Sequence, residues 1–240
     1  MTAVAVPLRG THPHPVIRAA RLQLVAWPYV MMWPWGILAL SFLVNLAIWA
    51  TVDEAEWTGG LLSIYVVQLV AHTQFFSRGF AFALGMSVTR RAYYAGTWLY
   101  AVLEAAAFGT VLLVLGLVED ATNGWGLSLQ YFGIFDRLGD ENLVVQWLVY
   151  VVPFLLVAAI GACLGLLRMR WGSNGVWTLI AVLIVLTGLA VVVISRLGRW
   201  GAIGDWLTGQ STAALFAGWP LPVAVVLGLL GYAVIRRATP

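Results

Sequence analysis

Long runs of apolar residues, separated by short polar segments, dominate the pattern of this 240-residue chain. A helix needs about 20 apolar residues to cross a bilayer core of about 30 Å, and six runs come close to that length or exceed it. None has the alternation of apolar and polar residues found in outer-membrane barrel strands. The pattern therefore predicts an all-α, polytopic membrane protein with six transmembrane helices. The six runs are Pro28 to Val52, Gly59 to Leu84, Ala92 to Val118, Leu143 to Leu167, Trp177 to Ile194 and Phe216 to Ile235.

The composition supports a membrane protein, since 62% of the residues are hydrophobic, 10% are charged and the mean hydropathy is +0.91. Soluble domains carry about 25% charged residues. We expect one transmembrane domain over residues 1–240. It consists of a cytoplasmic N-terminal segment (1–27), a six-helix bundle (28–235) and a cytoplasmic tail (236–240).

The charged residues predict the orientation. On one side of a six-span arrangement lie nine arginines and no acidic residue, whereas nine of the ten acidic residues lie on the other side. The positive-inside rule assigns the arginine side to the cytoplasm, so both termini are expected there, in the cytoplasmic (inner) membrane. The arginines occur singly or in pairs, so no nucleic-acid partner is expected. The nine are Arg9, Arg18, Arg21, Arg90, Arg91, Arg168, Arg170, Arg236 and Arg237.

The chain contains no lysine, because all 13 of its basic residues are arginine. A P-loop requires a lysine that reaches the β and γ phosphates, so this polypeptide carries no such motif. Cys163 is the only cysteine, which rules out an intrachain disulfide and a cysteine-based metal site. No histidine spacing typical of a metal site occurs either. We expect no metal and no cofactor in this chain.

A short polar segment between the second and third runs, residues 85 to 92, contains Arg90 and Arg91. Gly85, Ser87 and Thr89 provide turn and capping residues there. One interpretation is a topological anchor, because tight cytoplasmic loops tend to carry arginine. The alternative is a docking element for a partner protein.

The second interpretation rests on a resemblance. The pattern Leu84-Gly85-x-Ser87-x-Thr89-Arg90-Arg91-x-Tyr93-Tyr94-x-Gly96-Thr97 resembles the coupling loop of type-2 ABC transporter permeases, the ABC-2 type exporter family. In that family the loop docks into a cytoplasmic ATPase subunit. The resemblance implies that the coupling residues are Gly85, Ser87, Thr89, Arg90, Arg91 and Tyr93.

The same family has six spans, both ends in the cytoplasm, an amphipathic helix before the first span and a re-entrant segment between the last two. Residues 14–27 fit the amphipathic helix, and residues 199–220 fit the outer segment. The resemblance implies a permease that dimerises with an identical or related subunit, contacts membrane lipids and binds two cytoplasmic ATPase subunits. ATP and Mg are then expected in those partners. The apolar spans favour a hydrophobic or amphipathic cargo.

Polar residues within the second and third runs form a second candidate site. Gln68, His72, Arg78 and Glu104 are costly to expose to hydrocarbon, so they are expected to face protein or water. Counted from the hairpin, His72 and Glu104 lie at similar depths of roughly 20 Å and can meet. They line a translocation path or form an interhelical hydrogen bond. Arg78 either snorkels towards the cytoplasm or pairs with Glu104.

Two further segments carry predictions about packing. Gly161 and Gly165 form a pair of small residues four apart, which allows a close helix contact within one subunit or between two. The segment from Glu119 to Asn142 is rich in aromatic residues and is expected at the outer interface of the membrane.

Two other functions stay open. A self-sufficient secondary transporter would use ionisable groups at the midplane, and His72 and Glu104 fit that description. A membrane-embedded lipid-modifying enzyme needs clustered acid, base or nucleophilic groups, for which Asp136, Asp140 and Glu141 are the candidates.

Overall fold

The computed structural model describes residues 14–25, 28–51, 59–133 and 142–237, and these residues form helices and loops without a strand. The predicted all-α fold is confirmed for them. The elements in chain order are α1 (Pro15–Leu24), η1 (Pro28–Met32), α2 (Trp33–Trp49), α3 (Leu62–Gln74), η2 (Phe75–Gly79), α4 (Phe80–Gly85), α5 (Arg90–Ala121), η3 (Gly124–Ser128), α6 (Leu143–Arg196), α7 (Trp200–Thr208), η5 (Ala214–Gly218) and α8 (Pro220–Arg237). The η elements are single π-helical turns.

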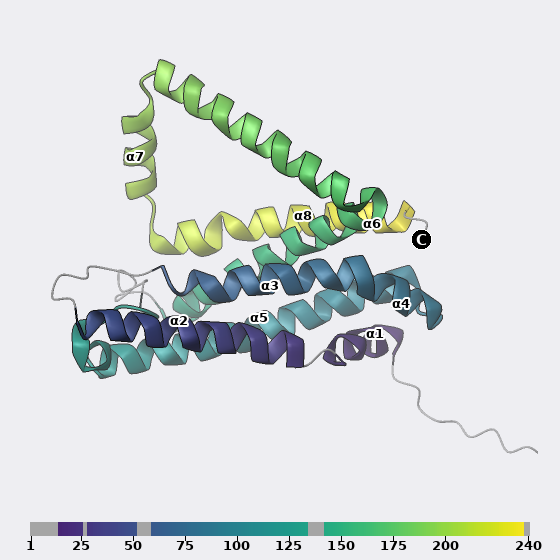
Figure 1. The fold of residues 1–240 in the computed structure, drawn as a ribbon, viewed down its shortest axis with the longest axis horizontal. Helices are drawn as coiled ribbons and strands as arrows, with labels where there is room; N and C mark the ends of the chain where they lie inside the picture. Colours follow the sequence, from purple (N-terminus) through teal and green to yellow (C-terminus); the bar gives the residue numbers. More distant parts are fainter. Residues whose placement is uncertain (1–13, 26–27, 52–58, 134–141, 238–240) are drawn as a thin grey trace, which may run out of the picture.

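The helices pack into an elongated bundle (Figure 1). In it α3 contacts α2 and α6, α5 contacts α1 and α6, and α6 contacts α8. The ends of α1 and α4 and the C-terminal end of α8 lie at one end of the bundle, and α7 lies at the other (Figure 1). The helical run from α3 through η2 to α4 is continuous, so a single long rod connects the two ends.

Four helices in the described part of the chain are long and apolar enough to cross a membrane: Val30–Trp49, Arg90–Ala121, Leu143–Arg196 and Ala214–Arg236. The fourth and fifth predicted spans both fall within α6. This helix has 54 residues, far more than the about 20 needed for one crossing. The second predicted span falls on the run from α3 to α4, which the π-helical turn divides. The arrangement of six crossings therefore stays a prediction.

A bend at Gly172 divides α6 into two arms. Gly172 has φ 65° and ψ −160°, a backbone conformation that residues with a side chain rarely adopt. The first arm lies in the bundle. The second arm leaves it and forms a triangle with α7 and α8 (Figure 1). Many apolar side chains on this arm, such as Ile184 and Val185, are exposed.

The predicted N-terminal amphipathic segment contains α1, which packs against the start of α5. Pro15 opens the helix, a position where its missing N–H has no cost. Ala19 is fully buried, and the Gln23 side-chain amide donates a hydrogen bond of 2.9 Å to Thr97 Oγ1. The close approach requires Gly96, since a Cβ there would lie 2.6 Å from the Ala19 Cβ. Residues 26 and 27 lie outside the described part.

The predicted outer segment 199–220 contains the short helix α7 and the turn η5. All residues of α7 are exposed or partly exposed. The helix lies between the end of α6 and the start of α8 (Figure 1).

Candidate functional site

The hairpin between α4 and α5 presents an exposed tip, which we define as residues 85–91. Ser87 has a positive φ of 60° and lies in the turn between the two helices. Thr89 caps α5, because its Oγ1 accepts a hydrogen bond of 3.3 Å from the Ala92 amide. Arg90 is partly buried, while four predicted coupling residues are exposed, namely Gly85, Ser87, Thr89 and Arg91.

Tyr93, the sixth predicted coupling residue, points into the bundle. Its side chain is only 1% exposed, so it is not part of the tip surface. Its hydroxyl donates a hydrogen bond to the Phe75 carbonyl at the start of η2. A π-helical turn disturbs the regular hydrogen-bond pattern of a helix, and Tyr93 satisfies this carbonyl. The residue therefore ties α5 to the helix before the hairpin.

A buried polar pair joins the same two rods deeper in the bundle. His72 Nε2 of α3 lies 3.0 Å from Glu104 Oε2 of α5. The Tyr100 hydroxyl, one turn before Glu104, donates a hydrogen bond of 2.8 Å to Glu104 Oε1. All three side chains are buried, and each of the two carboxylate oxygens has a polar partner. The structure thus brings together two of the four predicted path residues.

The other two predicted path residues are not hydrogen-bonded to this pair. Gln68 is 1% exposed and precedes His72 by one helical turn, and neither its Oε1 nor its Nε2 has a hydrogen-bond partner within the described ranges. A buried amide of this kind is typically satisfied by water or a bound group. Arg78 is exposed, and the partners of Glu104 are His72 and Tyr100 instead. It lines a groove beside α1.

Gly161 and Gly165 of α6 face the rod that carries His72. A Cβ on Gly161 would lie 2.7 Å from the His72 Cβ, and one on Gly165 would lie 2.6 Å from the Thr73 carbonyl oxygen. The two glycines therefore let α6 approach α3 within this subunit. Helix α6 therefore covers one side of His72.

Glu119, at the other end of α5, was predicted only as part of an outer interfacial segment. Its carboxylate is buried and accepts hydrogen bonds from the amides of Tyr131, Phe132 and Gly133 at 2.7–3.1 Å. The Trp125 indole N–H donates a further bond of 3.0 Å. The end of α5 therefore fastens the loop that follows it.

This loop folds into the bundle. Leu129 and Tyr131 are fully buried and Phe132 is 4% exposed, so these side chains belong to the core at this end. The Tyr131 hydroxyl donates to the Leu38 carbonyl of α2, and burial raises the pKa of this phenol above its ordinary value. Residues 134–141, including Asp136, Asp140 and Glu141, lie outside the described ranges.

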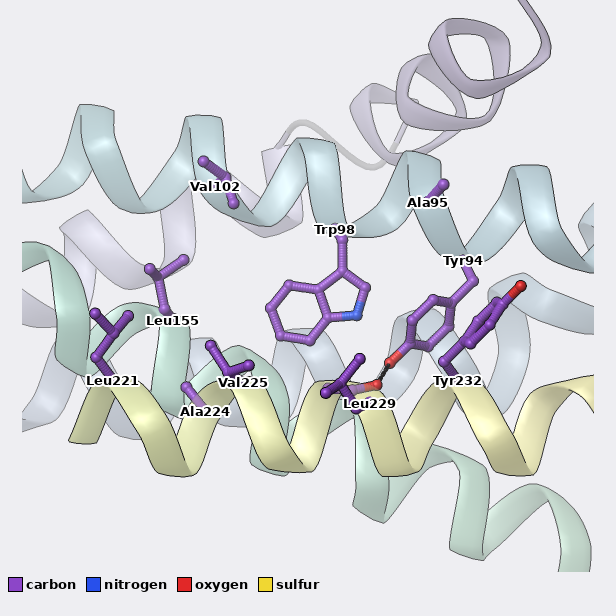
Figure 2. A pocket seen from close by; sticks show the side chains of 11 residues that line it. Tyr94, Ala95, Trp98, Val102, Leu155, Leu221, Ala224, Val225, Leu229 and Tyr232 are labelled. Carbon is purple, nitrogen blue, oxygen red and sulfur yellow. Dashed lines mark hydrogen bonds between the residues drawn. The ribbon is translucent and has the colours of Figure 1, made fainter. Parts of the chain in front are cut away.

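An apolar cavity of about 470 Å³ lies between α5 and α8. Figure 2 shows Trp98 and Val102 of α5 opposite Val225 and Leu229 of α8. The Tyr94 hydroxyl donates to the Gly228 carbonyl and closes one end. The size suits a hydrocarbon chain or another apolar group.

Within the described residues, no group of three or more His, Cys, Asp or Glu side chains is arranged to hold a metal ion. The chain matches no protein-family model, no curated protein and no solved structure.

Proposed function

We propose that this chain is the permease subunit of an ATP-driven exporter of the type-2 ABC class. It crosses the cytoplasmic membrane six times, with both termini in the cytoplasm and α1 at the cytoplasmic interface. Two copies, or one copy and a related subunit, form the transport unit, and two separate ATPase subunits bind ATP and Mg. The cargo is hydrophobic or amphipathic.

One observation carries the proposal: the exposed tip stands on two helical rods that are joined to each other at two levels. Near the tip, Tyr93 bonds to the Phe75 carbonyl. Deeper, Glu104 contacts His72, about 20 Å along α5 from Arg90. A force on the tip is therefore transmitted to both rods together, as a coupling element requires.

The position of the rods supports the same mechanism. The rod from α3 to α4 contacts the first arm of α6, and the two helices approach closely at Gly161 and Gly165. When ATP binding closes the ATPase subunits, the tip is pushed and the joined rods tilt against α6. The dimer then changes between inward-open and outward-open states. In this mechanism the buried pair of His72 and Glu104 stiffens the lever.

A secondary transporter is the second candidate, and the observation that favours it is the same buried cluster. Ionisable groups of this kind occur at the centre of ion-coupled transporters. Such a protein would need no ATPase, so the two proposals differ in their partners.

Purification from the native membrane in mild detergent, followed by mass spectrometry, tests the proposal. The expected result is recovery of a soluble P-loop ATPase in a ratio of one per permease chain, together with ATPase activity in the complex. Purified chain that transports in vesicles with an ion gradient and no ATPase would instead establish the secondary transporter.

A further inference from the structure

A groove of about 440 Å³ lies between the N-terminal segment and the rod that runs from α3 to α4. The last residues of α1 and the turn η1 form one wall, and the rod forms the other. Apolar side chains cover most of both walls, namely Leu22, Val25, Val30, Ala71, Phe75 and Phe82. The groove is therefore mainly a site for hydrocarbon.

Two polar side chains, Gln74 and Arg78, interrupt the apolar wall of the rod. They are four residues apart, with Gln74 just before the π-helical turn η2 and Arg78 within it, and so lie about one turn from each other. Neither makes a hydrogen bond or an ion pair with any residue that the structure describes. The nearest acidic group along these rods, Glu104, is already engaged by His72 and Tyr100.

Arg78 lies at the wall of an apolar groove and has no acidic partner among the described residues. Its guanidinium group can therefore bind an anion from outside the chain. A guanidinium group binds phosphate with two parallel hydrogen bonds, and these bonds are stronger where water is scarce. The side-chain amide of Gln74 offers a donor one turn deeper. The groove thus presents a cationic donor, a neutral donor and an apolar channel in sequence along one wall.

We propose that this groove holds one anionic glycerophospholipid. The lipid phosphate accepts hydrogen bonds from Arg78, an ester carbonyl accepts one from Gln74, and an acyl chain lies along Ala71 and Val30. A free inorganic phosphate would satisfy Arg78 but would leave the apolar walls uncovered. Charge and shape together therefore select a lipid over a soluble anion.

The groove is held open by contacts that do not involve the lipid. Gln23, on the α1 wall, donates its side-chain amide to Thr97 of α5, and Ala19 packs against Gly96. These contacts fix α1 to α5. The site is therefore largely formed before the lipid enters, which lowers the ordering cost of binding. The inference requires a membrane protein but does not rest on the ATPase partner.

Native mass spectrometry of the purified full chain tests this inference. The protein is exchanged into detergent with phosphatidylglycerol or with diacylglycerol, which has the same acyl chains and no phosphate, and the fraction with one retained lipid is measured. We expect phosphatidylglycerol to be retained roughly tenfold better, the ratio that one charge-assisted hydrogen bond provides. Equal retention of the two lipids would overturn the proposal, and so would equal displacement of phosphatidylglycerol by inorganic phosphate.

Variants locate the site. R78Q is expected to lower phosphatidylglycerol retention about tenfold, and R78K to lower it less, because lysine keeps the charge but loses the two-point contact with the phosphate. R168Q is the matched control, because Arg168 is an exposed arginine on α6 that does not line the groove. A71F fills the channel, leaves Arg78 in place and is expected to reduce retention of both lipids. Wild-type retention in R78Q or in a folded A71F protein, or an equal loss in R168Q, would refute the assignment.

Discussion

His72 Nε2 lies 3.0 Å from Glu104 Oε2, so a buried polar contact joins α3 to α5. Such a contact has an asymmetric energetic effect. Removing one partner leaves the other buried without this contact, whereas removing both leaves only the Tyr100 hydroxyl without its acceptor.

We therefore expect His72→Leu and Glu104→Leu each to lower the free energy of unfolding. The double variant should lower it by less than the sum of the two single effects. The coupling free energy should be about 1 kcal/mol, as for interhelical hydrogen bonds in membranes. Unfolding by denaturant in detergent measures it. Tyr100→Phe is the milder comparison, because it removes only one of the two donors to Glu104. Strictly additive effects of the two leucine substitutions would contradict an energetic link.

Glu119 provides the second prediction. Three consecutive backbone amides and the Trp125 indole donate to its carboxylate, and hydrogen bonds to a charged group contribute about 1.5–3 kcal/mol each. Glu119→Gln replaces one acceptor oxygen with a donor, so the loop that ends at Gly133 should loosen. Hydrogen exchange at residues 131–133 should accelerate at least tenfold, while Asp205→Asn, at an exposed acidic residue of α7, leaves it nearly unchanged. Unaltered exchange in Glu119→Gln would show that the carboxylate does not hold the loop.

Gly172 provides the third prediction. Its positive φ is strained for any residue with a Cβ, so Gly172→Ala should cost about 1–2 kcal/mol or change the angle between the arms of α6. Spin labels at Val144 and Val192, in a Cys163→Ala background, report the distance between the arms. Gly188→Ala is the matched control, because Gly188 is a helical glycine of the second arm with open space around its Cα. An unchanged distance together with unchanged stability in Gly172→Ala would mean that the bend does not depend on this glycine.

The sequence predicts much of this fold because its apolar runs have clear ends. The predicted span Ala92 to Val118 lies within α5, whose start is defined by the Thr89 cap, and the span Pro28 to Val52 overlaps η1 and α2. Depth counted from the hairpin also brings His72 and Glu104 to the same level. The depth of each residue follows from the rise per residue of a helix, because both rods begin at the same hairpin.

Other features depend on contacts that local pattern does not specify. Glu119 lies 12 to 14 residues before the amides that it accepts from, and no spacing rule links a helix end to so distant a loop. The aromatic residues of that loop suit a membrane interface and a protein core equally well, and Tyr131 lies in the core. Tyr93 follows the arginine pair in the sequence, yet the direction of its side chain depends on the carbonyl that the π-helical turn exposes. The sequence pattern also does not predict that helix α6 continues through residues 168–171. Arginine and methionine are good helix formers, but arginine is also common in cytoplasmic loops.

The fourth prediction concerns topology. In a Cys163→Ala background, a cysteine at Arg170 should react with a membrane-impermeant maleimide only after permeabilisation, whereas one at Asp205 should react in intact cells. Both side chains are exposed in the protein, so any difference in labelling reports the side of the membrane. Labelling of the Arg170 position from outside would contradict the proposed orientation.

The last prediction separates the two interpretations of the arginine pair in the exposed tip. If Arg90 and Arg91 only anchor the topology, changing both to lysine should have no effect, because the positive-inside rule depends on charge. If they dock into an ATPase, the same change should weaken binding, since the planar guanidinium group forms two-point contacts that an ammonium group does not. We expect the double lysine variant to insert normally, with roughly a tenfold loss of co-purified ATPase, equivalent to about 1.4 kcal/mol. The matched control changes Arg196 and Arg199, two exposed arginines next to α7, to lysine and should retain the partner. Full retention of the ATPase and of its activity in the Arg90 and Arg91 variant would leave the tip as an anchor, and a loss in both variants would point to a general effect of arginine on assembly.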